Sequence, residues 1–357
     1  MIANLKEKVQ KHLRHITTIT FFIGFAFDMF LLPDVNDSLS RYIGFVYIFL
    51  MAVFIVLRIR LQDINKNSKL ILNSITALTL GIACLSGSAL SFIFVYAFRS
   101  ADLLVSWPLF IILFVCMLIN ELVSNIRWRL IVDISVFIVS LTFYTLFNLP
   151  FLLNKQNDLI FFLGLGLSFS ISFSFIKLIT HVSKKINPIT LHFISILIPS
   201  LIGGLYILNL MPAVPLSIKN SNVYHYVQKQ STDYYALKEV RDQSFLDKFK
   251  YPVYYVNATN TTLYFFAAVR APAALTAPIS HVWEYYNSNT KSWETRNKLT
   301  FNIYGGRQDG YRAYSNINNA VPGKWRVTVK LDNNRIIGRY TFNVQNSTSI
   351  PLAEVKL

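Results

Sequence analysis

The chain has 357 residues, of which 53% are hydrophobic, and 34 Lys and Arg against 18 Asp and Glu give a net charge of +16. Residues 1–211 carry 16 Lys and Arg against 9 Asp and Glu, and most of this excess lies beside long apolar runs. It therefore indicates membrane topology and not nucleic-acid binding. The two cysteines, Cys84 and Cys116, fall inside those runs, so the remaining sequence contains no disulfide. There is no CxxC pair, metal-ligand spacing or haem motif, and we expect no metal and no cofactor.

Seven long apolar runs occupy the first 211 residues. A bilayer core requires about 20 apolar residues in a helix, and a lipid-exposed segment must satisfy its backbone groups internally. The sequence therefore predicts an all-α bundle of seven transmembrane helices over residues 1–211. The predicted spans are 16–32, 42–57, 70–98, 103–122, 130–149, 159–179 and 189–211.

The basic charge of the loops alternates along this region. Thirteen Lys and Arg fall on one side of the membrane and three on the other, and the basic side is cytoplasmic by the positive-inside rule. The N-terminus is then cytoplasmic, and an odd number of spans places residues from Pro212 onward outside. A cleaved signal peptide is disfavoured, because Asp28 and Phe30 stand where its cleavage region should be. The basic side collects Lys6, Lys8, Lys11, Arg14, Arg58, Arg60, Lys66, Lys69, Arg127, Arg129, Lys177, Lys184 and Lys185, and the other side Arg41, Arg99 and Lys155.

Asp28 is the best candidate for an intramembrane charge, because it lies about three turns into the first span. It would act as a proton or cation relay, or it would be an interfacial carboxylate paired with Arg41, Arg99 or a neighbouring helix. The second alternative is favoured, since the other ionisable residues cluster at span ends. Asp133 lies one turn after Arg129, a spacing that predicts a local ion pair.

Small residues at every second position of the sixth span form two stripes on nearly opposite sides of a helix. Such stripes let helices approach closely, so this span is expected to pack on two sides, within the bundle or against a second copy of the chain. One stripe is Gly164, Ser168 and Ser172, and the other is Gly166, Ser170 and Ser174.

The third and seventh spans are candidates for irregular helices. The third is too long to stand upright as a straight helix, so it is expected to tilt, to extend beyond the membrane or to break near Gly87. The seventh contains Pro199 followed by Gly203 and Gly204, a pattern typical of a kink. A broken helix would line a substrate path, whereas a kink without a charged partner is more often a packing feature.

The composition changes after Met211. Residues 212–250 are expected to form a juxtamembrane linker with one helix from about Asp233 to Lys250, because apolar residues recur there near helical spacing. From Tyr251 short aromatic and β-branched runs with a period of two predict an all-β, immunoglobulin-like antiparallel sandwich over 251–345, followed by a tail over 346–357. The predicted strands are 253–256, 263–269, 280–286, 299–304, 311–315, 325–331 and 336–344.

Five short motifs follow one another in this region: 263–270, 280–285, 310–315, 323–329 and 337–344. In order and spacing they resemble the DUF2914 family, bacterial domains of unknown function that often follow a multi-span membrane region. The resemblance covers about residues 250–345 and implies a bacterial membrane protein, with no activity to carry over. The chain departs from the family at Tyr311, where a Trp is usual, and in its longer hairpin at 287–293. Both departures would alter a binding face.

Strand alternation assigns the conspicuous aromatic residues to faces. His281, Trp283 and Tyr285 share one face of their strand, and Trp283 and Trp325 are predicted to lie in the core. His281 would be a metal ligand or a catalytic base, or it would be a hydrogen-bonded structural residue. The structural role is favoured, because no Cys, Asp or second His stands at useful spacing.

The residues from 212 onward carry 18 Lys and Arg against 9 Asp and Glu. This excess would form a face for anionic lipid headgroups or envelope polysaccharide, or it would be an ordinary solvated surface. We expect no catalytic residue. The candidate ligand-binding residues are His281, Arg307, Tyr311, Arg312, Arg326, Lys330 and Arg339.

Three functions compete. The first is a non-enzymatic multi-pass protein of the bacterial inner membrane, displaying a periplasmic sandwich that binds a protein, glycan or lipid of the envelope. The second is a transporter or channel that uses the bundle, with Asp28 as the intramembrane charge. The third, a membrane-embedded enzyme, is the weakest, because the sequence shows no paired carboxylates, His-rich loop or Gly-rich phosphate motif.

Overall fold

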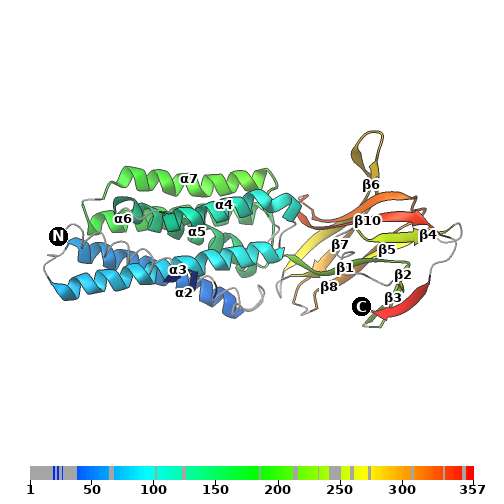
Figure 1. The fold of residues 1–357 in the computed structure, drawn as a ribbon, viewed down its shortest axis with the longest axis horizontal. Coiled ribbons are helices and arrows are strands. Elements are labelled where there is room, and N and C mark those ends of the chain that lie inside the picture. The colour runs from blue at the N-terminus through cyan, green and yellow to red at the C-terminus, as the bar shows by residue number, and fades with distance from the viewer. Residues whose placement is uncertain are drawn as a thin grey trace. The chain divides into compact units, whose positions relative to one another are not determined.

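The chain forms two compact units, a helical unit within 1–211 and a β unit made mainly of residues 212–357 (Figure 1). The structure is a computed structural model. It describes residues 19–20, 22–23, 26, 38–63, 68–100, 103–122, 126–184, 186–211, 216–231, 233–240, 251–257, 261–271, 275–306, 309–332, 334–347 and 351–357.

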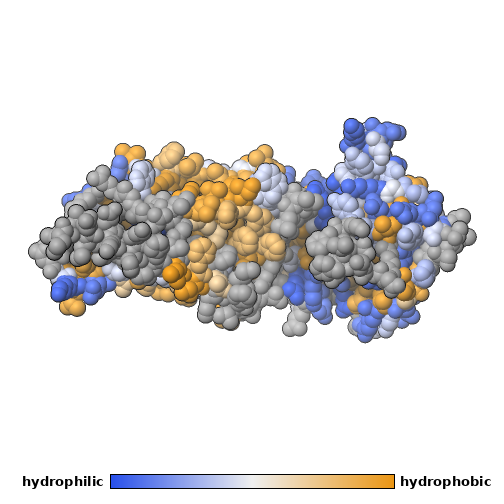
Figure 2. All heavy atoms as spheres, viewed as in Figure 1, coloured by the Kyte–Doolittle hydropathy of each residue, from blue (hydrophilic) through white to orange (hydrophobic). Residues whose placement is uncertain are grey.

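The described part of the helical unit contains six helices, of which five are long and apolar enough to cross a membrane. Figure 2 shows hydrophobic side chains over much of the visible face of this unit. These five indicate a multi-pass membrane protein, and they coincide with the predicted second, third, fifth, sixth and seventh spans. The helices are α2 (Ser38–Asp63), α3 (Lys69–Ser100), α4 (Leu103–Leu122), α5 (Ile126–Leu153), α6 (Asp158–Val182) and α7 (Pro188–Ile207).

For two of the seven predicted spans, the structure shows no helix long and apolar enough to cross a membrane among the described residues. Helix α4 coincides with the fourth span, but its long apolar stretch is the shorter Ser106–Ile119. The first predicted span, including Asp28, lies outside the described residues apart from a few positions. The structure therefore supports five candidate spans among the described residues.

Helix α3 is continuous, which excludes a break near Gly87 and leaves the other two alternatives, a tilt or an extension beyond the membrane. Ser86 and Ser88 are buried within the helical unit. The small side chains of this stretch therefore serve close packing and leave the helix intact. Helix α7 continues through Pro199, which lies inside it and is buried.

A buried ion cluster joins α2 to α5. Arg129 Nε lies 3.0 Å from Asp133 Oδ1, which confirms the predicted local pair. Arg58 on α2 adds a second guanidinium, with Nη1 2.6 Å from Asp133 Oδ2, and both side chains are almost fully buried. Breaking a buried pair by removing one partner costs about 3–5 kcal/mol. Asp133 is therefore a structural carboxylate, and its pair with Arg58 forms only when α2 packs against α5.

The two small-residue stripes of α6 have different surroundings. Gly164, Ser168 and Ser172 are buried, and Thr145 Oγ1 on α5 donates to the Gly164 carbonyl at 3.1 Å. The other stripe, Gly166, Ser170 and Ser174, is exposed at the surface of the unit. The first stripe is thus the contact with α5, and self-association through the second stays a prediction.

Leucine substitutions distinguish the two stripes. A Cβ at Gly164 would lie 3.1 Å from Leu146 Cδ2, whereas a Cβ at Gly166 meets nothing within 4 Å. Gly164→Leu should destabilise the detergent-solubilised protein by about 1–3 kcal/mol through overpacking, seen as a lower thermal midpoint. Gly166→Leu should leave that midpoint unchanged but reduce chemical cross-linking between copies. Gly204→Leu is the matched control, because its Cβ also meets open space. Equal cross-linking in all three would refute self-association through α6.

The β unit contains eleven described strands in three sheets (Figure 1). The orders are β1-β5-β8, β4-β10-β9-β6-β7 and β11-β3-β2, and every pairing is antiparallel except that of β4 with β10. All seven predicted strands are present. The bounds are β1 (Ser217–Tyr224), β2 (Tyr226–Gln230), β3 (Asp233–Glu239), β4 (Val253–Val256), β5 (Leu263–Arg270), β6 (Thr276–Asn287), β7 (Ser292–Tyr304), β8 (Tyr311–Ile317), β9 (Gly323–Leu331), β10 (Ile336–Asn346) and β11 (Leu352–Lys356).

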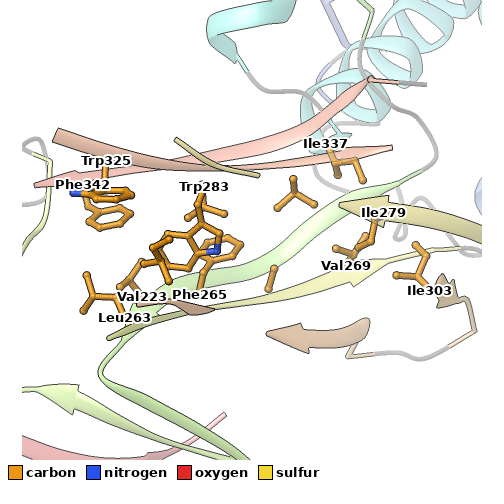
Figure 3. Packing of buried hydrophobic residues seen from close by; sticks show 14 of the residues in the cluster. Val223, Leu263, Phe265, Val269, Ile279, Trp283, Ile303, Trp325, Ile337 and Phe342 are labelled. Atoms are coloured by element: carbon orange, nitrogen blue, oxygen red, sulfur yellow. The ribbon is translucent and has the colours of Figure 1, made fainter. Parts of the chain in front are cut away.

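The main core lies between the three-stranded β1-β5-β8 sheet and the five-stranded sheet. Inward residues of both sheets interdigitate there, as expected for a sandwich. Trp283 and Trp325 are both almost completely buried, which confirms their prediction as core residues. Figure 3 shows Trp283 beside Phe265 of the opposite sheet, with the two ring centroids 6.4 Å apart.

A second, smaller core lies between the other face of β5 and the third sheet. It contains Tyr234 and Ala236 of β3 together with Phe266 and Ala268 of β5. The antiparallel sandwich is therefore extended by a third sheet that the sequence did not predict. The immunoglobulin-like classification stays a prediction.

The helix predicted from about Asp233 to Lys250 is wrong in its first part, because Asp233–Glu239 forms strand β3. Tyr234 and Ala236 are buried while their neighbours are partly exposed, which is the two-residue period of a strand. Residues 241–250 lie outside the described residues. The predicted linker also contains β1 and β2, and the predicted tail contains β11, which pairs with β3.

Candidate binding face

A hydrogen-bonded cluster joins the two sheets of the sandwich. Trp283 Nε1 on β6 donates to Ser315 Oγ on β8 at 2.9 Å, and His281 Nδ1 lies 3.0 Å from the same oxygen. The His281 ring lies edge to face with Phe265 and Phe301, at centroid distances of 5.0 and 4.7 Å. His281 is fully buried. The geometry supports the structural role for His281 and removes it from any exposed ligand face.

Strand alternation places the opposite side chains of β6 and β9 on the outer face of the five-stranded sheet. Glu284 on β6 is the centre of this face: Arg326 donates to it from Nε at 2.7 Å and from Nη2 at 2.8 Å, and Thr328 Oγ1 donates at 2.6 Å. Burial opposes ionisation of Glu284, but these hydrogen bonds and the charges of Arg326 and Lys330 outweigh it and lower its pKa. Glu284 is therefore a carboxylate at neutral pH.

Three predicted ligand-binding residues, Arg326, Lys330 and Arg339, share this outer face. Arg339 pairs with Thr328 across β10 and β9, so its side chain lies beside the same row. Lys298 of β7 pairs with Val282 and joins the face, and Lys324 precedes Arg326 by two residues on β9. Against these five cations, the described residues of the five strands place one carboxylate, Glu284, on this side. We call Lys298, Lys324, Arg326, Lys330 and Arg339 the basic face.

Tyr311 and Arg312 belong to a different sheet, on β8, so the predicted binding residues do not form one surface. Tyr311 packs against the main core. Arg312 Nη1 donates to the Leu357 carbonyl at 3.1 Å, and its guanidinium lies 5.6 Å from the Tyr234 ring centroid. Arg312 therefore holds the C-terminal end of the chain on the third sheet. Arg307 lies outside the described residues.

Sequence reasoning missed two cations of the basic face, Lys298 and Lys324, and two aromatic residues beside it, Trp293 and Tyr251. Trp293 of β7 has the Arg326 guanidinium 4.2 Å from its ring centroid, and Lys324 Nζ lies 4.6 Å from the ring centroid of Tyr251. Trp293 and Lys324 were detectable in part, since the hairpin at 287–293 and the alternation of β9 were both visible in the sequence. Tyr251 was not, because it precedes a strand that pairs in parallel with β10.

No group of three or more His, Cys, Asp or Glu side chains that would hold a metal ion occurs in the part of the chain that the structure describes. The basic face carries guanidinium and ammonium donors beside aromatic rings, and such donors can pair with anions.

A family model described as "Protein of unknown function (DUF2914)" matches residues 276–344. Residues 276–344 are a DUF2914 domain. The match extends from β6 into β10 and confirms the family resemblance over this range, which is shorter than the predicted 250–345. The DUF2914 domain contains His281, Glu284, Trp293 and the whole basic face, whereas Tyr251 lies outside it. No curated protein matches the chain.

Solved structures with local similarity are distant from this chain. An immunoglobulin-like protein from Pseudomonas aeruginosa is 11% identical with a TM-score of 0.21, covering 37% of this chain and 98% of that one. A β-glucosidase from Kluyveromyces marxianus is 13% identical with a TM-score of 0.18, covering 43% of this chain and 17% of that one. An alkylpurine DNA glycosylase from Pseudomonas fluorescens is 12% identical with a TM-score of 0.21, covering 88% and 100%. At these TM-scores the similarities carry no argument, and the sandwich rests on the strand pairing described above.

His281 makes the stability of the DUF2914 domain depend on pH. Burial lowers the pKa of His281 to about 3, whereas in an unfolded chain the value is about 6.5. Between these values the unfolded state binds a proton that the folded state does not, so stability falls as pH decreases, by up to about 1.4 kcal/mol per pH unit. Urea titration of the detergent-solubilised protein, followed by tryptophan fluorescence at about pH 7 and about pH 5.5, should show this loss.

His281→Gln should have a lower stability at neutral pH but a smaller loss on acidification, because Gln does not titrate. An identical pH dependence in the variant would show that His281 does not control the acid sensitivity of the domain.

Proposed function

We propose that this chain is a non-enzymatic, multi-pass protein of the bacterial inner membrane. Its DUF2914 domain faces the periplasm and binds an anionic partner of the cell envelope through the basic face. The observation that carries the proposal is the grouping of five cations around one carboxylate on the outer side of the five-stranded sheet.

The charge balance of this face supports an anionic partner. Arg326 is compensated by Glu284, with which it forms a bidentate pair. Lys298 is exposed, and Lys324 and Lys330 are half-buried. Residues two apart on a strand lie about 6.8 Å apart, and neighbouring strands about 4.8 Å apart. Such spacing suits repeated charges, as in an acidic polysaccharide or the headgroups of acidic glycolipids, better than a single small anion.

The distribution of basic residues supports the orientation. Thirteen Lys and Arg flank one side of the predicted spans and three flank the other, which by the positive-inside rule places the N-terminus in the cytoplasm. Seven spans then carry the β unit to the periplasm.

Cysteine labelling tests this topology. In a chain with Cys84 and Cys116 replaced by Ala, Asn289→Cys at the exposed β6–β7 turn should react with a membrane-impermeant maleimide in cells with a permeabilised outer membrane. Lys184→Cys, between α6 and α7, should react only after the inner membrane is disrupted. The reverse pattern, or equal labelling of both positions, would contradict a periplasmic domain.

Charge reversal tests the basic face. Lys298→Glu combined with Lys330→Glu should weaken retention of the full-length protein, in zwitterionic nanodiscs, on immobilised lipopolysaccharide by about tenfold at low salt. The matched control is Lys229→Glu combined with Lys238→Glu, which changes net charge equally on exposed positions of the third sheet. Equal losses in the two double variants would indicate non-specific attraction, and no loss in either would remove this face from the proposal.

A further inference from the structure

The β6–β7 hairpin projects from the five-stranded sheet (Figure 1), and Trp293 at its base contacts Arg326 of the basic face. Tyr286 and Trp293 pair across the two strands at this base, with their rings edge to face at a centroid distance of 5.2 Å. Beyond them the hairpin closes with a polar turn. An aromatic ring is thus presented where the projecting hairpin meets the cationic surface.

Arg326 contacts the ring of Trp293 and restricts its position. The Arg326 guanidinium lies 4.2 Å from the Trp293 ring centroid, a cation–π contact. Arg326 is in turn fixed by two hydrogen bonds to Glu284. Arg326 covers part of the indole and Tyr286 contacts it edge to face, so a ligand would contact the part of the ring that stays exposed. Trp293 is only partly buried, which is consistent with an accessible ring face.

Lys324 supplies a charge at the same place. Its Nζ lies 4.6 Å from the Tyr251 ring centroid and 5.9 Å from that of Trp293. No carboxylate among the described residues lies within ion-pair distance of Lys324, whereas Arg326 is neutralised by Glu284. Aromatic rings on two sides restrict the lysine side chain without cancelling its charge. The ammonium group therefore retains its capacity to pair with an external anion.

We propose that Trp293, Lys324 and Tyr251 form a subsite for one carboxylated sugar unit of an acidic glycan. The inference rests on the proposed function and names the ligand class of the same face. The C–H face of the sugar ring packs on the exposed part of the Trp293 ring, and its carboxylate pairs with the Lys324 ammonium. Tyr251, which is 50% exposed, borders the subsite on the β4 side of the sheet.

The turn of the hairpin favours a glycan over a bilayer surface. Insertion into a membrane interface requires apolar side chains at the leading edge. Here residues 288–292 are Ser, Asn, Thr, Lys and Ser, all exposed, and Figure 2 shows the hairpin as hydrophilic. Asn287 Oδ1 accepts hydrogen bonds from the backbone N–H groups of Asn289 and Thr290, which orders this polar turn.

Binding of a defined acidic oligosaccharide tests the subsite. The full-length protein in phosphatidylcholine nanodiscs is titrated with an oligogalacturonate, with a maltooligosaccharide of equal length as the neutral probe. Wild type should bind the acidic probe more tightly than the neutral one. Trp293→Ala and Lys324→Gln should each weaken acidic binding by about tenfold or more. Trp293→Tyr should retain most of the affinity, since it keeps a ring at the position.

Matched variants control for surface and fold effects. Tyr304→Ala removes an exposed ring at the other end of β7, and Lys229→Gln removes an exposed charge on the third sheet, so both should bind as wild type. Thermal unfolding of each variant verifies the fold, and Lys324→Gln keeps the test independent of any loss of hairpin structure in Trp293→Ala.

The remaining outcomes separate this inference from the proposed function. Wild-type affinity in Trp293→Ala and Lys324→Gln, together with a loss in the Lys298→Glu and Lys330→Glu double variant, overturns the subsite and leaves the basic face. Binding to phosphatidylglycerol vesicles without binding to oligogalacturonate overturns the glycan as ligand. Failure of the wild type to bind any acidic probe overturns both.

Discussion

The Ser315 hydroxyl is the contact on which the arrangement of the β unit depends. It receives the indole N–H of Trp283 and lies within hydrogen-bonding distance of His281, so one side chain of β8 is tied to two of β6. Sliding β6 relative to β8 would break both hydrogen bonds. Each buried donor left without a partner would cost about 1–3 kcal/mol. These two hydrogen bonds define the position of β6 along its axis relative to β8. They thereby also position the residues on the opposite side of β6.

The outer face follows from that position. Since His281 and Trp283 point inward, Glu284 and Tyr286 must point outward. Glu284 then orders Arg326, Arg326 supports Trp293, and Trp293 borders Lys324. A chain of contacts thus runs from the core of the DUF2914 domain to its candidate ligand subsite. Because these side chains are already ordered, ligand binding would cost less conformational entropy.

Each unit contains a buried carboxylate that is paired with arginine. Asp133 lies between Arg58 and Arg129 in the helical unit, and Glu284 is held by Arg326 in the β unit. Arginine suits this role because its planar group stays charged and donates two hydrogen bonds in one geometry. Lys324 has aromatic rings around it in place of a carboxylate. This contrast separates the charges that stabilise the fold from the charge most available to a partner.

The sequence alone determined the features that depend on local patterns. These are the apolar spans later seen as five long helices, the seven predicted strands, the inward positions of Trp283 and Trp325, and the Arg129–Asp133 pair. Each follows from a spacing of a few residues along the chain. The helix predicted from Asp233 to Lys250 is wrong at Asp233–Glu239, where the apolar spacing fits a strand as well as a helix. Packing of Tyr234 and Ala236 against β5 favours the strand. Only the tertiary structure separated Arg312 from Arg326, Lys330 and Arg339, added the third sheet, and brought Tyr251 and Lys324 together. Alternation assigns a residue to a face of its own strand, but which strands become neighbours depends on pairing between distant segments.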